Sequence, residues 1–228
     1  MKQEVATIYK LTDMNMKTYR GYPWTLGKWN RTSGKGDLCG PGWLHAYTSP
    51  VLAELLDPIH ANFREYRLFR GEASGPVISD SGLKVGYTNM RITEELPRLH
   101  ITTENRIRFG IACACRVYTS AEYRAWAGRW VSGADRTEAA ARAAARAART
   151  AEAAVRAAKT AEAAVRAART AEATWATEAA AEAAWAAEAA AEAAVGLPLC
   201  DLATWAVGND DLTAILTIKL RKRGKHVA

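Results

Sequence analysis

Apolar and polar side chains alternate along several short runs in the first hundred residues. Residues 4–12 (EVATIYKLT) and 22–29 (YPWTLGKW) have the two-residue period of a half-buried strand. The runs 66–73 and 83–92 share this period, and an Asp-Ser-Gly turn at 80–82 separates them. A shorter run at 43–47 (WLHAY) also reads as a strand. The pattern predicts a small sheet within the first hundred residues.

A helix is expected between these strands. Ser49 can serve as an N-cap and Pro50 suits the first helical turn, so the segment 50–63 (PVLAELLDPIHANF) is predicted to be helical. A glycine-rich stretch at 33–43 (SGKGDLCGPGW) precedes it and is predicted to be a loop.

After residue 103 the apolar residues no longer follow the two-residue period of a strand, and helices are predicted. The segment 104–118 (ENRIRFGIACACRVY) has the composition of a buried helix. A capping box at 119–122 (TSAE) should start a second helix that ends at Ser132 and Gly133. A further cap at 135–138 (DRTE) should start a third. Strands followed by helices predict the α+β class.

The third of these helices is predicted to be very long. Residues 135–195 contain no Gly or Pro and include a near-identical ten-residue repeat, TAEAAVRAAK followed by TAEAAVRAAR. Alanine has the highest helix propensity, and an unbroken helix of this length would span about 90 Å. Its larger side chains recur every ten residues and rotate by about −80° each time, which does not form a heptad seam.

The charges of this alanine-rich segment are polarised. Residues 135–169 carry a net charge of +4 and residues 170–196 a net charge of −5. This order opposes the helix macrodipole, so we expect an antiparallel partner that places the basic half beside the acidic half. The partner is either the same helix folded back near Thr170 or a second copy in a homo-oligomer. A hairpin needs a break that the sequence does not show, so the homo-oligomer is preferred.

Four regions follow from these patterns. They are a mixed domain at 1–100, two packing helices at 101–133, the alanine-rich segment at 134–196, and a short apolar element with a basic tail at 197–228.

Composition limits the partners, cofactors and cellular location that we expect. The net charge is +7, most of it in residues 1–133, which hold 18 Lys/Arg against 12 Asp/Glu. This excess fits an acidic partner such as a nucleotide, but it is also ordinary for a basic protein. The four cysteines form no CxxC pair, so we expect reduced thiols, no metal and no cofactor. No signal segment or apolar span is visible, and a cytoplasmic protein without a membrane partner is predicted.

Several N-terminal motifs carry a resemblance. Tyr9-Lys10, the WTLGK motif at 24–28, the LCGPGWLHAY motif at 38–47, residues 70–75 and the LKVG motif at 83–86 stand in the same order as in a domain of unknown function. The chain resembles this family, found in many phage and prophage proteins, over about residues 5–130. The resemblance implies a small mixed domain of phage type and host-cell localisation, with no assigned activity. Tyr47 stands where many members carry a second cysteine.

His45 is the strongest candidate for chemistry, between Trp43 and Tyr47 and after a Gly-Pro-Gly loop. A neutral imidazole at a strand edge can bind a ligand or act as a general base, although a lone strand histidine is more often structural. Basic residues follow on the helix exit and the next two strands. We predict an anion-binding site that unites His45, Tyr47, Trp43, Arg70, Lys84 and Arg91. Arg64 and Arg67 belong to the same basic set, and a solvated basic face is the competing interpretation.

Other motifs are weaker. The loop 33–37 (SGKGD) lacks the spacing of a phosphate-binding loop, and the basic tail from Lys219 to Lys225 offers only a weak case for nucleic acid. The segments around 45–50 and 66–75 also resemble ADP-ribosyltransferase-like folds, which imply a catalytic glutamate. Glu72 or Glu94 would have to take that role, and neither lies in a diagnostic motif. No catalytic residue can be assigned.

The sequence therefore leaves two hypotheses for the function. The first is a phage-encoded, non-enzymatic binding protein that captures a nucleotide-like anion or a host protein and oligomerises through its alanine-rich helix. The second is an enzyme that acts on a nucleotide and has an ADP-ribosyltransferase-like fold.

Overall fold

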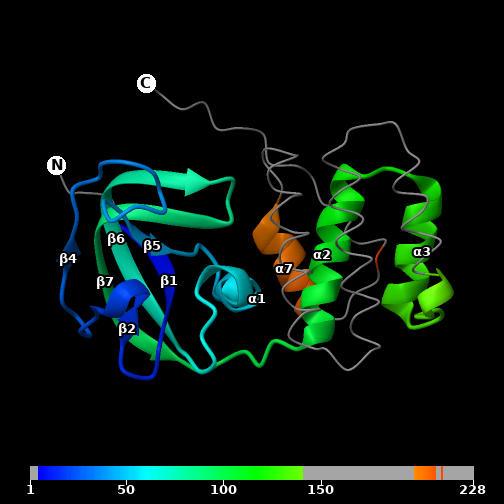
Figure 1. Cartoon of the computed structure of the whole chain (residues 1–228), viewed down its shortest axis with the longest axis horizontal. Coiled ribbons are helices and arrows are strands. Elements are labelled where there is room, and N and C mark those ends of the chain that lie inside the picture. The colour runs from blue at the N-terminus through cyan, green and yellow to red at the C-terminus, as the bar shows by residue number, and fades with distance from the viewer. Residues whose placement is uncertain (1–4, 141–197, 209–211, 213–228) are drawn as a thin grey trace. The chain divides into compact units, whose positions relative to one another are not determined.

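A computed structural model describes residues 5–140, 198–208 and 212 (Figure 1). The chain divides into two compact units, Met1–His100 and Ile101–Ala228, and each is described here by itself. Among the described residues, the first contains a five-stranded antiparallel sheet, a two-stranded antiparallel sheet and one α-helix, and the elements of the second are helices. The α+β class is confirmed.

Three strands dominate the first unit. The strand β1 (Ala6–Thr12) pairs with β6 (Arg67–Asp80), which in turn pairs with β7 (Lys84–Leu96), all antiparallel. The predicted turn at 80–82 is confirmed as the β6–β7 connection, where Leu83 N donates to Asp80 O. Two short strands, β4 (Asn30–Arg31) and β5 (Leu44–Ala46), pair with successive parts of β7.

The pairing closes into a ring. Beyond β5, Tyr47 and Tyr9 exchange two backbone hydrogen bonds of 2.8 and 2.9 Å, which link the end of β5 back to β1. Hydrogen bonds therefore run from β1 through β6, β7 and β5 and return to β1. This closure brings side chains from the first, fifth and seventh strands close together.

A core of apolar side chains lies against the sheet. It contains Ile8, Trp24, Leu44, Ala46, Phe69, Ala73, Val85, Met90 and Ile92. Ile8 on β1 and Ala46 on β5 are each 1% exposed, as the alternating pattern of these strands predicts. Burial of this face by the hydrophobic effect stabilises the ring.

The strand predicted at 22–29 is wrong for most of its length. Only β3 (Tyr22–Pro23) is extended, and it pairs with β2 (Lys17–Thr18) across the short 3-10 helix η1 (Tyr19–Gly21). Pro23 has no N–H for a ladder, and Gly27 adopts a φ of 77° that ends extended structure. Trp24 still points into the core, which explains the apolar signal.

The helix α1 (Pro50–His60) starts as predicted and ends earlier than predicted. Leu52 N donates to the Ser49 side chain at 3.4 Å, which confirms the N-cap. Asp57 ends the helix, because its backbone oxygen accepts from Asn62 N and its carboxylate accepts from Phe63 N. Asn62 takes a left-handed φ of 51°, which stops helical propagation before residue 63.

The second unit contains α2 (Thr103–Val117), α3 (Ala121–Ser132) and α7 (Leu199–Gly208) among its described residues. The helix α2 is capped by Thr102 and Asn105 in a reciprocal box. The Asn105 side chain also donates to Ala206 O of α7 at 3.0 Å. The apolar element predicted after residue 197 is therefore a helix that packs on α2.

Two predicted caps are displaced by one or two residues. Ser120, not Thr119, caps α3, since its hydroxyl accepts from Tyr123 N. Thr137, not Asp135, accepts from Ala140 N at the start of the next helical residues, while Asp135 holds the Thr137 hydroxyl at 2.7 Å. Gly133 ends α3 with a φ of 78°, as predicted.

The alanine-rich segment lies outside the described residues beyond Ala140. Its predicted length, hairpin and self-association therefore lie outside the described residues, and so does the basic tail from Lys219 to Lys225. Cys113 and Cys115 are both buried although they diverge around α2, because neighbouring residues bury this helix on more than one side. Cys39 is exposed and Cys200 is partly buried, and none of the four cysteines is in a disulfide. Among the described helices, none has the length and apolar character needed to cross a bilayer.

Candidate functional site

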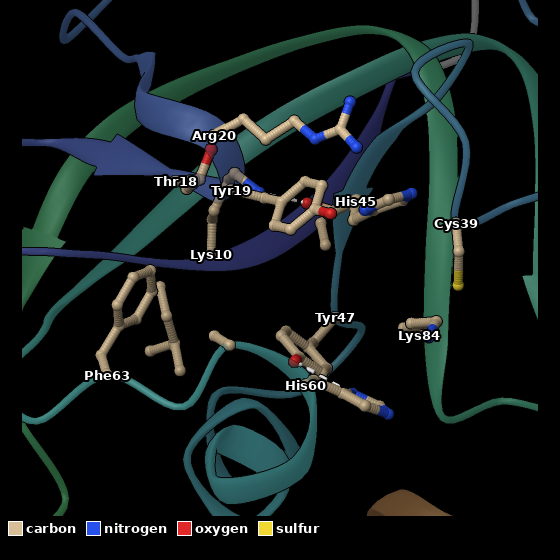
Figure 2. A pocket seen from close by; sticks show the side chains of 13 residues that line it. Lys10, Thr18, Tyr19, Arg20, Cys39, His45, Tyr47, His60, Phe63 and Lys84 are labelled. Atoms are coloured by element: carbon tan, nitrogen blue, oxygen red, sulfur yellow. Dashed lines mark hydrogen bonds between the residues drawn. The ribbon is translucent and has the colours of Figure 1, made fainter.

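A cavity of about 510 Å³ opens within the first unit (Figure 2). Its ionisable and hydroxyl-bearing lining residues are Lys10, Thr18, Tyr19, Arg20, Cys39, His45, Tyr47, His60 and Lys84. Leu11, Ala46, Ala61 and Phe63 complete the wall. These thirteen residues include three cationic side chains and no carboxylate. The cavity is therefore suited to an anion.

The strand β5 and the loop before it position His45. His45 lies opposite Gly86 of β7, where a Cβ atom would come within 2.5 Å of Leu38 Cδ1. This glycine lets the loop 33–43 fold over the strand, and the loop presents Leu38 O to His45 Nε2. A carbonyl only accepts, so Nε2 carries the ring proton and Nδ1 holds the lone pair when the ring is neutral.

Burial lowers the pKa of His45, and the charges of Lys10 and Lys84 act in the same direction, while the hydrogen bond to Leu38 opposes them. The ring is therefore mostly neutral near pH 7. A neutral imidazole can accept a hydrogen bond from a ligand.

Tyr47 and His60 form a second pair on the cavity wall. The Tyr47 hydroxyl hydrogen-bonds with His60 Nδ1 at 3.1 Å, and the two rings stack with 18° between their planes (Figure 2). Burial raises the pKa of Tyr47 well above its usual value, and the Asp57 charge adds to this. Burial, aided by Lys84, lowers the pKa of His60 to about 4. Both groups are neutral at pH 7.

Lys10 forms the deepest cationic part of the wall. It is 7% exposed, and its Nζ atom donates to His45 O at 2.5 Å and lies 4.7 Å from the Trp24 ring centroid. Burial lowers the pKa of Lys10 to about 7. Protonation of this amine is unfavourable in the empty cavity because the charged form is desolvated. A bound anion would supply a counter-charge and favour the protonated form.

The cavity mouth carries exposed groups. Tyr19 is 76% exposed, and the Arg20 guanidinium lies 5.2 Å from its ring centroid. Lys84 on β7 is less exposed, at 15% of its side chain, and it pairs with Asp80 at 3.5 Å. An aromatic ring beside cations offers both a stacking surface and a phosphate contact.

Three of the six predicted site residues line this cavity, namely His45, Tyr47 and Lys84. Trp43 instead anchors the loop 33–43, because its Nε1 atom donates to Gly36 O at 2.9 Å. Arg70 and Arg91 do not line the cavity either.

The arginines of the β6–β7 hairpin are paired with glutamates, and we call these three contacts the hairpin pairs. They join Arg67 to Glu95, Arg70 to Glu94, and Arg91 to Glu72, at 2.5, 2.8 and 2.6 Å. The predicted convergence of these arginines on His45 therefore does not occur, since each faces a carboxylate on the neighbouring strand. The basic residues form a charge-balanced surface here.

The structure also locates the two weaker motifs of the sequence, the candidate glutamates and the loop 33–37. Glu72 and Glu94, the candidate catalytic glutamates, belong to the hairpin pairs and do not line the cavity. The loop 33–37 is a turn, in which Gly34 N donates to Gly42 O, and a strand follows it. Within the described residues, no cluster of three or more ligating side chains could hold a metal ion.

Sequence reasoning missed several cavity residues, of which Lys10, Arg20 and His60 carry the most chemistry. One signal was available for Lys10. It shares a strand face with Ile8, so alternation already placed a lysine beside a core residue. No comparable signal existed for Arg20 or His60, because their place on the wall depends on a 3-10 turn and on the packing of α1.

Comparisons with known proteins add no relative to this picture. No family model matches the chain, and neither the curated proteins nor the solved structures yield a match.

Proposed function

We propose that this chain is a non-enzymatic binding protein that captures a small, nucleotide-like anion in the cavity of its first unit. The supporting observation is the cavity wall, which contains Lys10, Arg20 and Lys84 and no carboxylate. Its volume of about 510 Å³ is within the usual range for small-ligand sites.

The nucleotide class follows from two kinds of contact on the wall. Cationic side chains and the neutral His45 ring suit a phosphate group. Tyr19 at the mouth and the half-buried Phe63 suit the flat face of a base. The resemblance to phage proteins adds a setting for this activity, namely capture of a host nucleotide signal, and self-association through the alanine-rich segment belongs to the same proposal.

Binding is preferred to catalysis for a structural reason. Transfer chemistry of the ADP-ribosyltransferase type requires a glutamate beside the ligand, and Glu72 and Glu94 face arginines away from the cavity wall. A host protein remains the alternative partner, which would dock on the mouth.

The test combines calorimetry with mass spectrometry. Adenosine monophosphate, ribose 5-phosphate, inorganic phosphate and adenosine are titrated into the full chain, and binding should require the phosphate and strengthen with the base. Separately, NAD and cyclic nucleotides are incubated with the protein. Ligand that is depleted and then recovered intact on heating supports capture. A new product would support an enzyme. If adenosine bound as tightly as adenosine monophosphate, anion capture would be refuted.

A further inference from the structure

The buried amine of Lys10 is the group in this cavity whose chemistry exceeds simple anion binding. Its Nζ atom contacts a backbone carbonyl and an aromatic face, and none of the ion pairs found among the described residues involves it. Lys84, the other lysine of the wall, pairs with Asp80. The wall thus contains one lysine with a carboxylate partner and one without.

An ammonium held this way loses hydration without gaining a full counter-charge, so the neutral amine is favoured. With a pKa of about 7, about half of the Lys10 side chains carry a free lone pair at neutral pH. An exposed lysine with an ordinary pKa has roughly one neutral amine in a few thousand at that pH. The lone pair makes Lys10 a nucleophile under conditions where other lysines are inert.

The surrounding side chains select what could reach this amine. Arg20 and Lys84 attract an anionic group, and the absence of lining carboxylates removes repulsion. A ligand that carries both a phosphate or carboxylate and a carbonyl carbon would be held by the first and exposed to Lys10 through the second.

We propose that Lys10 captures carbonyl-bearing anions as a reversible Schiff base in this cavity. The proposal rests on the proposed anion-binding function and specifies a ligand class for it. The Lys10 nitrogen forms a bond to the carbonyl carbon, and the carbonyl oxygen takes up the proton that the nitrogen loses. The resulting carbinolamine expels its hydroxyl as water to leave a C=N bond. One amine and one carbonyl yield one imine and one water, with no change in oxidation state.

The test uses glyoxylate, a small anionic aldehyde, with the full chain at pH 7 and cyanoborohydride to trap the imine. Intact mass and peptide mapping then locate the adduct among the ten lysines. We expect Lys10 to be modified at least tenfold faster than any other lysine, with a rate that rises through pH 7 and levels above it. Lys10→Arg keeps the positive charge and cannot form an imine, so it should abolish the selective adduct. The matched control Lys28→Arg removes an exposed lysine and should leave the Lys10 adduct unchanged.

Further arms separate this proposal from the function on which it rests. Acetaldehyde lacks the anionic group and should label Lys10 at least fivefold more slowly than glyoxylate, and adenosine monophosphate should compete with the adduct. Suppose that calorimetry shows binding of adenosine monophosphate but glyoxylate labels all lysines evenly. This result would overturn the Schiff base and leave anion capture intact. Selective Lys10 labelling that is equal for both aldehydes, without nucleotide binding, would overturn anion capture and the ligand class inferred from it. Unfolding curves for Lys10→Arg establish that a lost adduct does not reflect lost structure.

Discussion

The cavity wall and the β6–β7 hairpin both carry basic side chains, and they differ in what faces those side chains. On the hairpin, Arg67, Arg70 and Arg91 each face a glutamate within 2.8 Å. On the wall, no carboxylate is present, and Lys10 is buried against a carbonyl and a ring. The two regions therefore differ in how their basic side chains are compensated, and the number of basic residues alone does not describe this difference.

The hairpin pairs also explain why counting charges along the chain is misleading. Residues 64–91 hold five Lys/Arg against three Asp/Glu, and the antiparallel register sets Glu72 opposite Arg91 and Arg70 opposite Glu94. Each pair cancels locally, and solvent screens what remains. The wall differs because no acidic residue lines the cavity, although Lys84 pairs with Asp80 outside that lining.

The sharpest way to break this comparison is to reverse one charge in each region. Lys84→Glu should weaken binding of adenosine monophosphate by about 100-fold, because it puts a carboxylate on a wall that has none. Arg91→Glu, the matched reversal on the hairpin, should change the affinity by less than about twofold. Calorimetry measures both. Equal losses in the two variants would mean that long-range charge, not the wall, governs binding.

A second test examines the unpaired amine by removing it. Lys10→Met keeps the length of the side chain and should raise the free energy of unfolding at pH 7 by on the order of 2 kcal/mol, because it removes a buried charge. In the wild type, the unfolded chain binds more protons than the folded one between pH 7 and 10.5. Stability should therefore rise with pH in that window, by at most about 1.4 kcal/mol per unit.

Urea denaturation of both proteins at several pH values checks this. The slope above pH 7 should be present in the wild type and absent in Lys10→Met. A lower stability of Lys10→Met at pH 7 would show that the contacts of the amine outweigh its desolvation.

A third test concerns how His60, on the same wall, affects stability at acidic pH. The pKa of His60 is about 4 when folded and near 6.5 when unfolded, so the unfolded state takes up a proton first as pH falls. Stability should decline between pH 6.5 and 4, with His60 contributing about 1–2 kcal/mol after allowance for its partial exposure. In His60→Gln, part of this decline should disappear, as thermal unfolding across that range would show. An unchanged decline would assign it to other groups, His45 first.

The smallest effect is expected on the hairpin. A double-mutant cycle of Arg91→Gln and Glu72→Gln should give a coupling energy of about 0.5 kcal/mol, because both side chains are partly exposed to water. Denaturation midpoints at low and high salt would measure it, and salt should reduce it further. A coupling above about 2 kcal/mol would mean that the pair is structurally more important than its exposure implies.

Sequence alone determined the local elements where signals are short in range. The Ser49 cap, the turn at 80–82, the periods of β1 and β7 and the stop at Gly133 all depend on neighbouring residues, and all are found. Of the six predicted site residues, His45, Tyr47 and Lys84 line one cavity. The misplaced strand at 22–29 shows the limit, because one core tryptophan can imitate a strand pattern.

Only the tertiary structure decided which charges are compensated. The register of β6 and β7 assigned a glutamate to each hairpin arginine, and the Tyr9–Tyr47 closure gathered Lys10, His45 and His60 around one cavity. The Lys10–His45 and Tyr47–His60 contacts join residues 35 and 13 positions apart along the chain, where no local pattern specifies a partner. The sequence of β1 placed a lysine on a core face, and the absence of an acid beside it followed only from how the ring of strands closes.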